Sequence, residues 1–347
     1  MTIDEKYMSR ALQLARQGAG HTSPNPMVGA VVVCDGMIVG EGFHRQCGQA
    51  HAEVNAIASV NDPGVLHEST IYVTLEPCSH YGKTPPCAKL LIEKGVKRVV
   101  VGCLDPFEKV SGRGVEMLRE AGINVTVGVL ENECKALNER FFTAHTTKRP
   151  WVMLKWAQSR DGFMANEDGA VRFSTALTQR LMHSERSRVD AILVGARTVA
   201  VDNPSLTTRH WSGSSPLRVV IDGDLSLPSH SLLFNDGGKT LVYNIKKDEV
   251  KGNVEWARID VMPQAWLSDL YRRGITSVMV EGGASILRQF INAGCWNEAR
   301  IEISPVVLSK GIKAPEVGMR NAIPMHLDGN DILVLKNVTD NCKLATQ

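Results

Sequence analysis

Apolar residues in the first half of the chain follow two spacings in turn, and the change of spacing predicts the order of its strands and helices. Residues 28–42 form two β-rich runs joined at Asp35-Gly36, a dipeptide that favours the tight turn of a β-hairpin. From residue 52 to about residue 129, patterns typical of helices and strands alternate. Gly95 and Gly122 stand where the C-caps of two of these helices belong. Strands that alternate with helices after an opening hairpin indicate a mixed sheet with helices on both faces, an α/β sandwich.

The pattern breaks near residue 146, and a second α/β series follows. Residues 131–150 predict a helix that leads into a polar, basic connection. New strand and helix patterns begin at Trp151 and continue to about residue 308, whereas the tail after Gly311 has no clear pattern beyond one strand-like run. Two domains are therefore expected, residues 1–146 and 147–347, each long enough to bury a core.

Composition narrows the classes of function. With 43% hydrophobic and 22% charged residues and a formal net charge of +2, the chain shows no sign of disorder or of a surface for nucleic acid. No apolar run has the length of a membrane span, and the N-terminus has the pattern of a folded helix rather than of a signal peptide. We expect a cytoplasmic protein with a small-molecule partner. Its eight cysteines are too few for a disulfide framework, so clustered cysteines are first of all candidates for metal binding.

His51, Cys78 and Cys87 form such a candidate set. A catalytic zinc site takes three protein ligands and keeps a fourth position for water. Pro86 places Cys87 in what should be the first turn of a helix, where partial positive charge stabilises a thiolate. Glu53 follows His51 by two residues, so both side chains can serve one site only at the start of a helix, and Glu53 fits proton transfer better than metal ligation. A structural zinc is the alternative, but such sites usually have four ligands and no fourth candidate has a suitable spacing.

This arrangement matches a known catalytic signature. His-x-Glu followed by Pro-Cys is typical of zinc nucleobase deaminases, in which the glutamate acts as general acid and base. The second cysteine departs from the short form of the signature, because eight residues rather than two separate Cys78 from Cys87.

Five segments of the first half together resemble the deaminase half of the bifunctional riboflavin-biosynthesis enzymes. They are TSPNPMVGAVVV (22–33), GFH (42–44), HAEVNAI (51–57), EPCSHYGKTPPCAKLLIEKGVKRVVVG (76–102) and DPFEKVSGRGVEMLREAGI (105–123). The resemblance implies a cytidine-deaminase-like α/β/α sandwich with one zinc ion per chain. The implied reaction is hydrolytic deamination of 2,5-diamino-6-(5-phosphoribosylamino)pyrimidin-4-one. The residues implied to contact this substrate are Asn25, His44, His80 and Lys83.

In the second half, residues 277–290 place a Glu-Gly-Gly turn between a strand and a helix. Backbone amides at such a helix start can bind a phosphate, but a simple tight turn is the alternative, because the G-x-G-x-x-G pattern is missing. Together with residues 155–162, 186–209 and 217–222, this segment resembles the reductase half of the same enzymes. The resemblance implies a dihydrofolate-reductase-like α/β domain that uses NADPH to reduce the ribosyl group to ribityl.

By this resemblance, the residues of the reductase site divide between cofactor and substrate. The NADP site is implied to contain Ala157, Phe173, Thr198, Asp202 and Gly283. The residues implied to lie near substrate are Lys155, Arg186, Leu206, Arg209 and Glu281, with the two arginines clamping the phosphate. Residues 169–175 read GAVRFST where many relatives read G-x-S-x-W-I-T, so Val171 replaces a serine that contacts substrate and Phe173 replaces a tryptophan. For Arg197 and Arg218, a solvated surface position is favoured over contact with the NADP 2′-phosphate.

These observations predict a two-domain enzyme, a zinc-dependent deaminase joined to an NADPH-dependent reductase, that forms a homo-oligomer, either a dimer or a tetramer. A nucleic-acid deaminase is one alternative, but it should carry a basic, aromatic face, which a near-neutral chain with 5% aromatic residues does not suggest. The other alternative is a deaminase with a single activity, whose second half is a scaffold or oligomerisation module. The GAVRFST departure leaves that alternative open.

Overall fold

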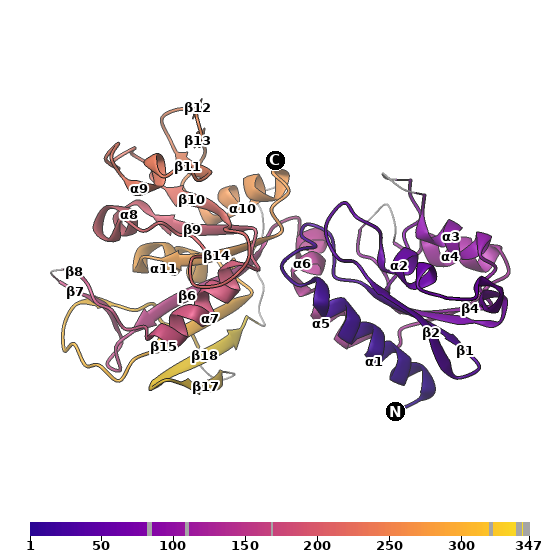
Figure 1. Cartoon of the computed structure of the whole chain (residues 1–347). Helices are drawn as coiled ribbons and strands as arrows, with labels where there is room; N and C mark the ends of the chain where they lie inside the picture. Colours follow the sequence, from indigo (N-terminus) through magenta and orange to yellow (C-terminus); the bar gives the residue numbers. More distant parts are fainter. Residues whose placement is uncertain (82–84, 108–110, 168, 319–321, 338–341, 343–347) are drawn as a thin grey trace. The chain divides into compact units, whose positions relative to one another are not determined.

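The computed structural model divides the chain into two compact units, Met1–Thr147 and Lys148–Gln347 (Figure 1). It describes residues 1–81, 85–107, 111–167, 169–318, 322–337 and 342. Within these ranges, no helix is both long enough and apolar enough to cross a membrane. Each unit is built from helices packed on a mixed sheet, so the predicted α/β fold class is confirmed.

The first unit contains a five-stranded sheet in the order β2-β1-β3-β4-β5. Its strands are β1 (Gly29–Cys34), β2 (Met37–Phe43), β3 (Thr70–Leu75), β4 (Arg98–Cys103) and β5 (Asn124–Val127). The hairpin of β1 and β2 is antiparallel, β3 pairs antiparallel with β1, and β3, β4 and β5 run parallel. The hairpin turns where the sequence predicted, with φ of 49° at Asp35 and 75° at Gly36.

Helices cover both faces of this sheet. They are α1 (Ile3–Ala15), α2 (Ala52–Ala58), α3 (Cys87–Glu93), α4 (Arg113–Glu120), α5 (Glu131–Leu137) and α6 (Glu139–Thr147). Ala30 and Val32 of β1 pack with α2, α3 and α4, whereas Val31 and Val33 pack with α1 and α5 on the opposite face (Figure 1). Successive side chains of a strand point to opposite faces, so a strand that is buried on both faces reads as a continuous apolar run.

The second unit contains a ten-stranded sheet in the order β12-β13-β11-β10-β9-β14-β6-β15-β18-β17. Its strands are β6 (Trp151–Gln158), β9 (Ala191–Gly195), β10 (Leu217–Ile221), β11 (Thr240–Asn244), β12 (Glu249–Lys251), β13 (Val254–Arg258), β14 (Ser277–Gly282), β15 (Glu298–Ile303), β17 (Ile323–Leu327) and β18 (Asn330–Lys336). The strands from β13 to β15 in this order are parallel, and antiparallel strands extend both edges. A small sheet joins β7 (Phe163–Asn166), β8 (Gly169–Ala170) and β16 (Ile312–Lys313).

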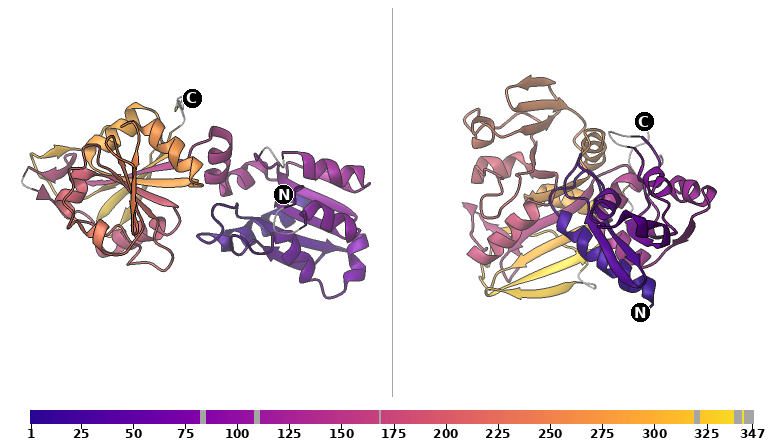
Figure 2. Two further views of the ribbon diagram at one scale, coloured as in Figure 1. Left: turned by 90° about the horizontal axis from the view of Figure 1, so that it is seen from above. Right: turned by 45° about the vertical axis from the view of Figure 1, so that its right-hand side comes forward.

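Helices also cover both faces of the large sheet (Figure 2). They are α7 (Ala176–Arg186), α8 (Ala196–Asp202), α9 (Leu232–Asn235), α10 (Pro263–Arg272) and α11 (Ala284–Asn292). Side chains of α10 and α11 form the main core with one face of the sheet. A smaller apolar cluster joins α8 and α9 to the other face through Ile192, Val194 and Val220.

The C-terminal tail, which the hydrophobic pattern left largely uninterpreted, adds the β17–β18 hairpin to one edge of the sheet. A disulfide bond that the sequence did not predict joins Cys295, just after α11, to Cys342. The two cysteines are 47 residues apart, so only the fold brings them together. The other six cysteines are free, and they include Cys78 and Cys87.

Candidate functional site

His51, Cys78 and Cys87 converge although they come from three different parts of the first unit. His51 is the N-cap residue of α2, Cys78 follows β3, and Cys87 is the first residue of α3. Nδ1 of His51 lies 3.6 Å from Sγ of Cys78 and 3.4 Å from Sγ of Cys87. The three potential ligand atoms lie within 4.8 Å of one another. One imidazole nitrogen and two sulfurs in so small a triangle suit zinc, which prefers nitrogen and sulfur ligands.

The surroundings of Cys78 favour the thiolate form. Its sulfur accepts a hydrogen bond from the backbone N–H of Cys87 at 3.3 Å. The Cys87 thiol and the His51 imidazole also hydrogen-bond this sulfur, and together these contacts lower the pKa of Cys78 to about 4. Because cysteine binds metal as thiolate, Cys78 is ready to act as a ligand. The hydrogen bond to Cys78 and burial raise the pKa of Cys87, so a bound metal would have to stabilise the second thiolate.

Glu53 lies in the first turn of α2, next to the three candidate ligands. Its side chain is buried, with 3% of the residue exposed. Burial, together with the nearby Cys78 sulfur, raises the pKa of Glu53 to about 7. His51 stands before the helix and Glu53 in its first turn, so the two side chains meet at the helix start, which the spacing required.

The structure brings two of the expected substrate residues, Asn25 and His44, together beside His51. The Asn25 side-chain nitrogen lies 3.3 Å from Nε2 of His44, and Nδ1 of His44 lies 3.1 Å from the Ala50 carbonyl oxygen. Nδ1 must therefore carry the proton that is donated to Ala50, and Nε2 accepts from the Asn25 amide. Burial lowers the pKa of His44, which keeps the ring neutral. The His44 and His51 rings meet edge to face at 5.4 Å between centroids.

His80 is exposed and lies beside aromatic residues that the sequence did not single out. Its ring centroid lies 6.2 Å from that of Phe107, and the Phe107 centroid lies 5.2 Å from that of His145. Phe107 belongs to the DPFEKV segment that follows β4. Lys83, the remaining expected substrate residue of this unit, lies outside the described residues.

Glu76 is a buried residue that sequence reasoning missed. One of its carboxylate oxygens accepts from the backbone N–H groups of Gly114 and Val115 at 2.9 and 3.2 Å, and the other accepts from those of Asp105 and Gly112 at 3.2 and 2.9 Å. The carboxylate thus holds the start of α4 against the end of β3, two residues before Cys78. A charged residue that ends an apolar strand directly before Pro-Cys was the available signal in the sequence.

In the second unit, several expected site residues lie toward the carboxyl ends of three neighbouring strands. Lys155 and Ala157 lie on β6, Thr198 lies on the helix after β9, and Glu281 lies near the end of β14. These three strands are neighbours and run parallel, and ligands of open α/β sheets bind outside the carboxyl ends of such strands. Gly283 joins the group, because its N–H donates to Oγ1 of Thr198 at 2.9 Å.

Gly282 and Gly283 form the turn that leads into α11. Gly282 has φ of 124°, which favours glycine, and a Cβ added there would meet no atom within 4 Å. The first N–H groups of a helix have no partner within the helix and suit a phosphate, so the start of this nine-residue helix is a candidate site for part of a dinucleotide.

Arg186 and Glu281, both expected near substrate, form a largely buried ion pair with each other. Nε and Nη2 of Arg186 donate to the two carboxylate oxygens of Glu281 at 2.7 and 2.6 Å. Burial alone would raise the pKa of Glu281, but the charge and hydrogen bonds of Arg186 outweigh it and lower the pKa to about 2. Arg209 is exposed, and its Nη1 donates to Oγ of Ser205 at 3.0 Å.

Phe173, Asp202 and Leu206 do not lie on these three strands. Phe173 is buried, and its carbonyl oxygen accepts from the side chain of Asn330 on β18 at 3.1 Å. Asp202 is exposed at the end of α8. Leu206 is buried in the apolar cluster of α8 and α9.

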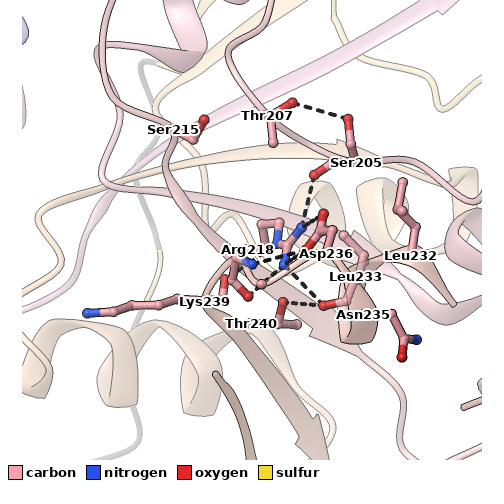
Figure 3. A network of polar contacts seen from close by, with 12 residues as sticks. Ser205, Thr207, Ser215, Arg218, Leu232, Leu233, Asn235, Asp236, Lys239 and Thr240 are labelled. Atoms are coloured by element: carbon pink, nitrogen blue, oxygen red, sulfur yellow. Dashed lines mark hydrogen bonds and ion pairs between the residues drawn. The ribbon is translucent and has the colours of Figure 1, made fainter. Parts of the chain in front are cut away.

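Arg218 corrects an expectation from the sequence. Arg197 is exposed, but Arg218 is buried, with 2% of the residue exposed, so the solvated position favoured for it is wrong. Figure 3 shows its guanidinium enclosed by Asp236 and by main-chain carbonyl groups. The signal in the sequence was an arginine within the otherwise apolar strand LRVVI, which predicts a buried charge with a partner.

Two family models match the chain, one in each unit. The RibD C-terminal domain matches residues 150–331, and the cytidine and deoxycytidylate deaminase zinc-binding region matches residues 1–103.

Proteins similar to the chain match nearly all of its length. The riboflavin biosynthesis protein RibD of Aquifex aeolicus is 40% identical, and the match covers 92% of both chains. RibD of Bacillus amyloliquefaciens is 43% identical, with 91% of this chain and 88% of the relative covered. Among solved structures, a diaminohydroxyphosphoribosylaminopyrimidine deaminase/5-amino-6-(5-phosphoribosylamino)uracil reductase of Thermotoga maritima is 38% identical, with a TM-score of 0.88 and coverage of 96% and 98%.

Proposed function

The chain belongs to the RibD family of riboflavin biosynthesis proteins, and we infer that it is a bifunctional deaminase and reductase. The observation that carries this inference is the convergence of His51, Cys78 and Cys87 beside a buried Glu53, in a chain whose relatives match both units. The substrate is 2,5-diamino-6-(5-phosphoribosylamino)pyrimidin-4-one. Deamination precedes reduction of the ribosyl group to ribityl.

In the deaminase unit, His51, Cys78 and Cys87 would hold one zinc ion per chain. Zinc, when bound, is a Lewis acid that activates water for attack on the ring carbon bearing the amine. Glu53 transfers a proton from the attacking water to the departing amine, because its carboxyl group is buried beside the three ligands at the start of α2. Its burial also keeps bulk water from taking over that transfer.

The pyrimidine ring is held by uncharged hydrogen-bonding groups. Asn25 and His44 form one connected pair next to His51, with their donor and acceptor directions set by the Ala50 carbonyl group. His80 is exposed beside Phe107, where it can contact the sugar side of the substrate. Lys83 carries the positive charge in this set, which suits a phosphorylated sugar.

In the reductase unit, the cofactor and the substrate would bind at the carboxyl ends of β9, β14 and β6. NADPH, when bound, supplies the hydride that reduces C1 of the ribosyl group. The residues proposed to line its site are Ala157, Phe173, Thr198, Asp202 and Gly283. The residues proposed to lie near substrate are Lys155, Arg186, Leu206, Arg209 and Glu281.

Of the two arginines in the substrate set, Arg209 is the better phosphate ligand. Three N–H donations of Arg186 already go to Glu281 and to the Thr207 carbonyl group. Arg209 is exposed and forms no ion pair within the described residues. A guanidinium with unused donors binds a phosphate more readily than one that is already paired.

The alternative of a single-activity deaminase with a non-catalytic second half is not favoured. The RibD C-terminal domain match extends over residues 150–331, and the relatives share both halves of the chain. The departure of residues 169–175 from the pattern of many relatives changes three side chains, those of Val171, Phe173 and Ser174, within the matched residues.

Two assays on the purified chain test this proposal. Ammonia release from the diaminopyrimidine substrate should precede NADPH oxidation, and NADPH oxidation alone should follow addition of the deaminated substrate. Cys87→Ser should lose most of the zinc and the ammonia release but retain oxidation of NADPH with deaminated substrate. A wild-type chain that releases ammonia but never oxidises NADPH would favour the single-activity alternative.

Two finer statements belong to the same proposal. Metal analysis should find about one zinc per chain, because one set of three ligands is present among the described residues. We also propose a homo-oligomer, either a dimer or a tetramer, which light scattering during size-exclusion chromatography would test.

A further inference from the structure

Two arginines hold the carbonyl groups on either side of Leu206. Leu206 is 3% exposed and has φ of 54°, a left-handed conformation that is strained for a residue with a side chain. The Ser205 carbonyl before it accepts from Nη1 of Arg218 at 3.3 Å. The Thr207 carbonyl after it accepts from Nη1 of Arg186 at 3.1 Å. Strained backbone persists only where the surrounding structure over-determines it, and it concentrates at functional sites.

Each of these arginines is fixed by a carboxylate that meets it with both oxygens. Arg186 pairs with Glu281 at 2.7 and 2.6 Å, and Arg218 pairs with Asp236 at 2.5 and 2.7 Å. The two arginine side chains are 13% and 3% exposed, so neither pair is a mobile surface contact. Two-point pairing fixes the plane of a guanidinium, and the remaining donors then point in set directions.

Arg218 also ties the segment around Leu206 to α9. Its Nη2 donates to the carbonyl group of Leu233 at 3.1 Å, a contact drawn in Figure 3. The same nitrogen donates to the carbonyl group of Gly238 at 2.7 Å. A second link comes from Asn203, whose side-chain oxygen accepts from the N–H of Leu232 at 2.8 Å. The Leu206 side chain lies in the same apolar cluster as Leu233. Hydrogen bonds and packing therefore fix the same strained turn.

The turn also directs Arg209. The Ser205 hydroxyl, on the residue that Arg218 holds through its carbonyl group, accepts from Nη1 of Arg209 at 3.0 Å. The same hydroxyl lies 3.2 Å from that of Thr207, as Figure 3 shows. A displacement of Ser205 would thus move the exposed guanidinium of Arg209.

We propose that Arg218, held by Asp236, is a positioning residue for the phosphorylated substrate of the reductase. It keeps Ser205 in place, and through Ser205 it sets the turn at Leu206 and the direction of Arg209. This inference rests on the proposed function, in which Leu206 and Arg209 lie near substrate. Arg218 does not touch the substrate itself, because its donors are used inside the protein.

Arg218 is not expected to bind the cofactor. A buried arginine whose guanidinium is occupied by Asp236 and carbonyl groups has no group to offer the NADP 2′-phosphate. Loss of the positioning contact should therefore raise KM for the phosphoribosyl substrate and leave KM for NADPH almost unchanged.

Arg218→Lys in the full chain tests this expectation. Lysine keeps the charge beside Asp236, but its compact ammonium group cannot reproduce the planar fork that reaches Ser205 as well. We expect KM for 5-amino-6-(5-phosphoribosylamino)uracil to rise about 10-fold or more, because small displacements of a binding group are costly. KM for NADPH and the rate of deamination should stay within about twofold of wild type, since they reflect binding energies that do not involve this turn.

Arg149→Lys is the matched control. Arg149 is another fully buried arginine of the same unit. Its Nη1 donates to Asn297 and to the Pro150 carbonyl group, and neither residue belongs to the turn at Leu206. It should lower the melting temperature without raising KM for the substrate. If Arg218→Lys loses a similar amount of thermal stability with KM unchanged, Arg218 has only a structural role and the proposal is overturned.

A second variant keeps the test decisive if Arg218→Lys does not fold. Asp236→Asn keeps the size and an acceptor oxygen but removes the charge that orients Arg218, and it should raise KM for the substrate about 3-fold or more. Unchanged KM in this variant, with an active wild type, would overturn the positioning role. A wild-type chain that never oxidises NADPH with this substrate would instead overturn the proposed function.

Discussion

Gly114 lies directly against the carbonyl group of Pro77. A Cβ at position 114 would stand 2.0 Å from that oxygen, far inside van der Waals contact. The contact joins the first turn of α4 to the residue before Cys78, at the place where Glu76 accepts four backbone hydrogen bonds. The second glycine of the GRG segment, Gly114, is therefore required because no larger side chain fits against Pro77, the residue before the candidate zinc ligand Cys78.

Gly114→Ala should destabilise the first unit and disturb zinc binding. The added methyl group meets backbone rather than a flexible side chain, so we expect a loss of about 1–3 kcal/mol in the free energy of unfolding, as for other overpacked sites. Urea unfolding and metal analysis would measure both effects. Gly223→Ala is the control, because a Cβ there would meet only Val261 at an ordinary 3.6 Å. Equal stability of the two variants would contradict this account of Gly114.

Glu53→Gln should separate catalysis from metal binding. Glutamine keeps the size and the hydrogen-bonding shape of the side chain but cannot transfer the proton, so deamination should fall about 10²-fold or more. Zinc content should stay near that of wild type, and reduction of the deaminated substrate should persist. Rates of ammonia release and NADPH oxidation, with metal analysis, would test this. Loss of zinc would instead make Glu53 a ligand or a support of one, and normal deamination would assign proton transfer to another group.

The ion pair of Glu281 and Arg186 should make stability depend on pH in the acid range. The pKa of Glu281 is lowered from 4.5 to about 2 in the folded protein, because Arg186 outweighs the effect of burial. Its contribution is therefore fully present above the pKa of the unfolded chain and is lost as pH falls from about 4.5 toward 2. Since one pKa unit corresponds to about 1.4 kcal/mol, the full contribution is on the order of 3 kcal/mol.

Comparison with Glu281→Gln isolates this effect. The variant has no carboxyl group at this position, so the difference in unfolding free energy between wild type and variant should be largest near neutral pH and should shrink below pH 4.5. Urea unfolding between about pH 3 and 7 would measure the difference. A difference that does not change over this range would show that the pair does not titrate as described.

Residues 1–147 should fold and deaminate without the rest of the chain. The first unit has its own sheet, helices on both faces and two apolar clusters, so it contains what an independent domain needs. Circular dichroism and ammonia release on the isolated fragment would test this. If this fragment and residues 148–347 were both insoluble or inactive, the two units would depend on each other for folding.

Local signals in the sequence sufficed where a few neighbouring residues decide the outcome. Asp35 and Gly36 predicted the hairpin because the turn needs positive φ at both residues, and the structure has it. The set of His51, Cys78 and Cys87 could be proposed from residue types and spacing, because a metal imposes the same demand on any fold that binds it. The order of apolar runs predicted the fold class, because each spacing matches one kind of element.

Only the tertiary structure decided which charged residues meet. Arg186 and Glu281 are 95 residues apart, and Arg218 and Asp236 are 18 apart, so no local pattern couples them. The apolar neighbours of Arg218 in LRVVI indicate that it is buried, but they do not show which groups surround its guanidinium, namely Asp236 and main-chain carbonyl groups. The left-handed turn at Leu206 is likewise invisible in the sequence, since leucine does not favour it. Contacts from separate elements impose that conformation, and such contacts exist only once the sheet and its helices have assembled.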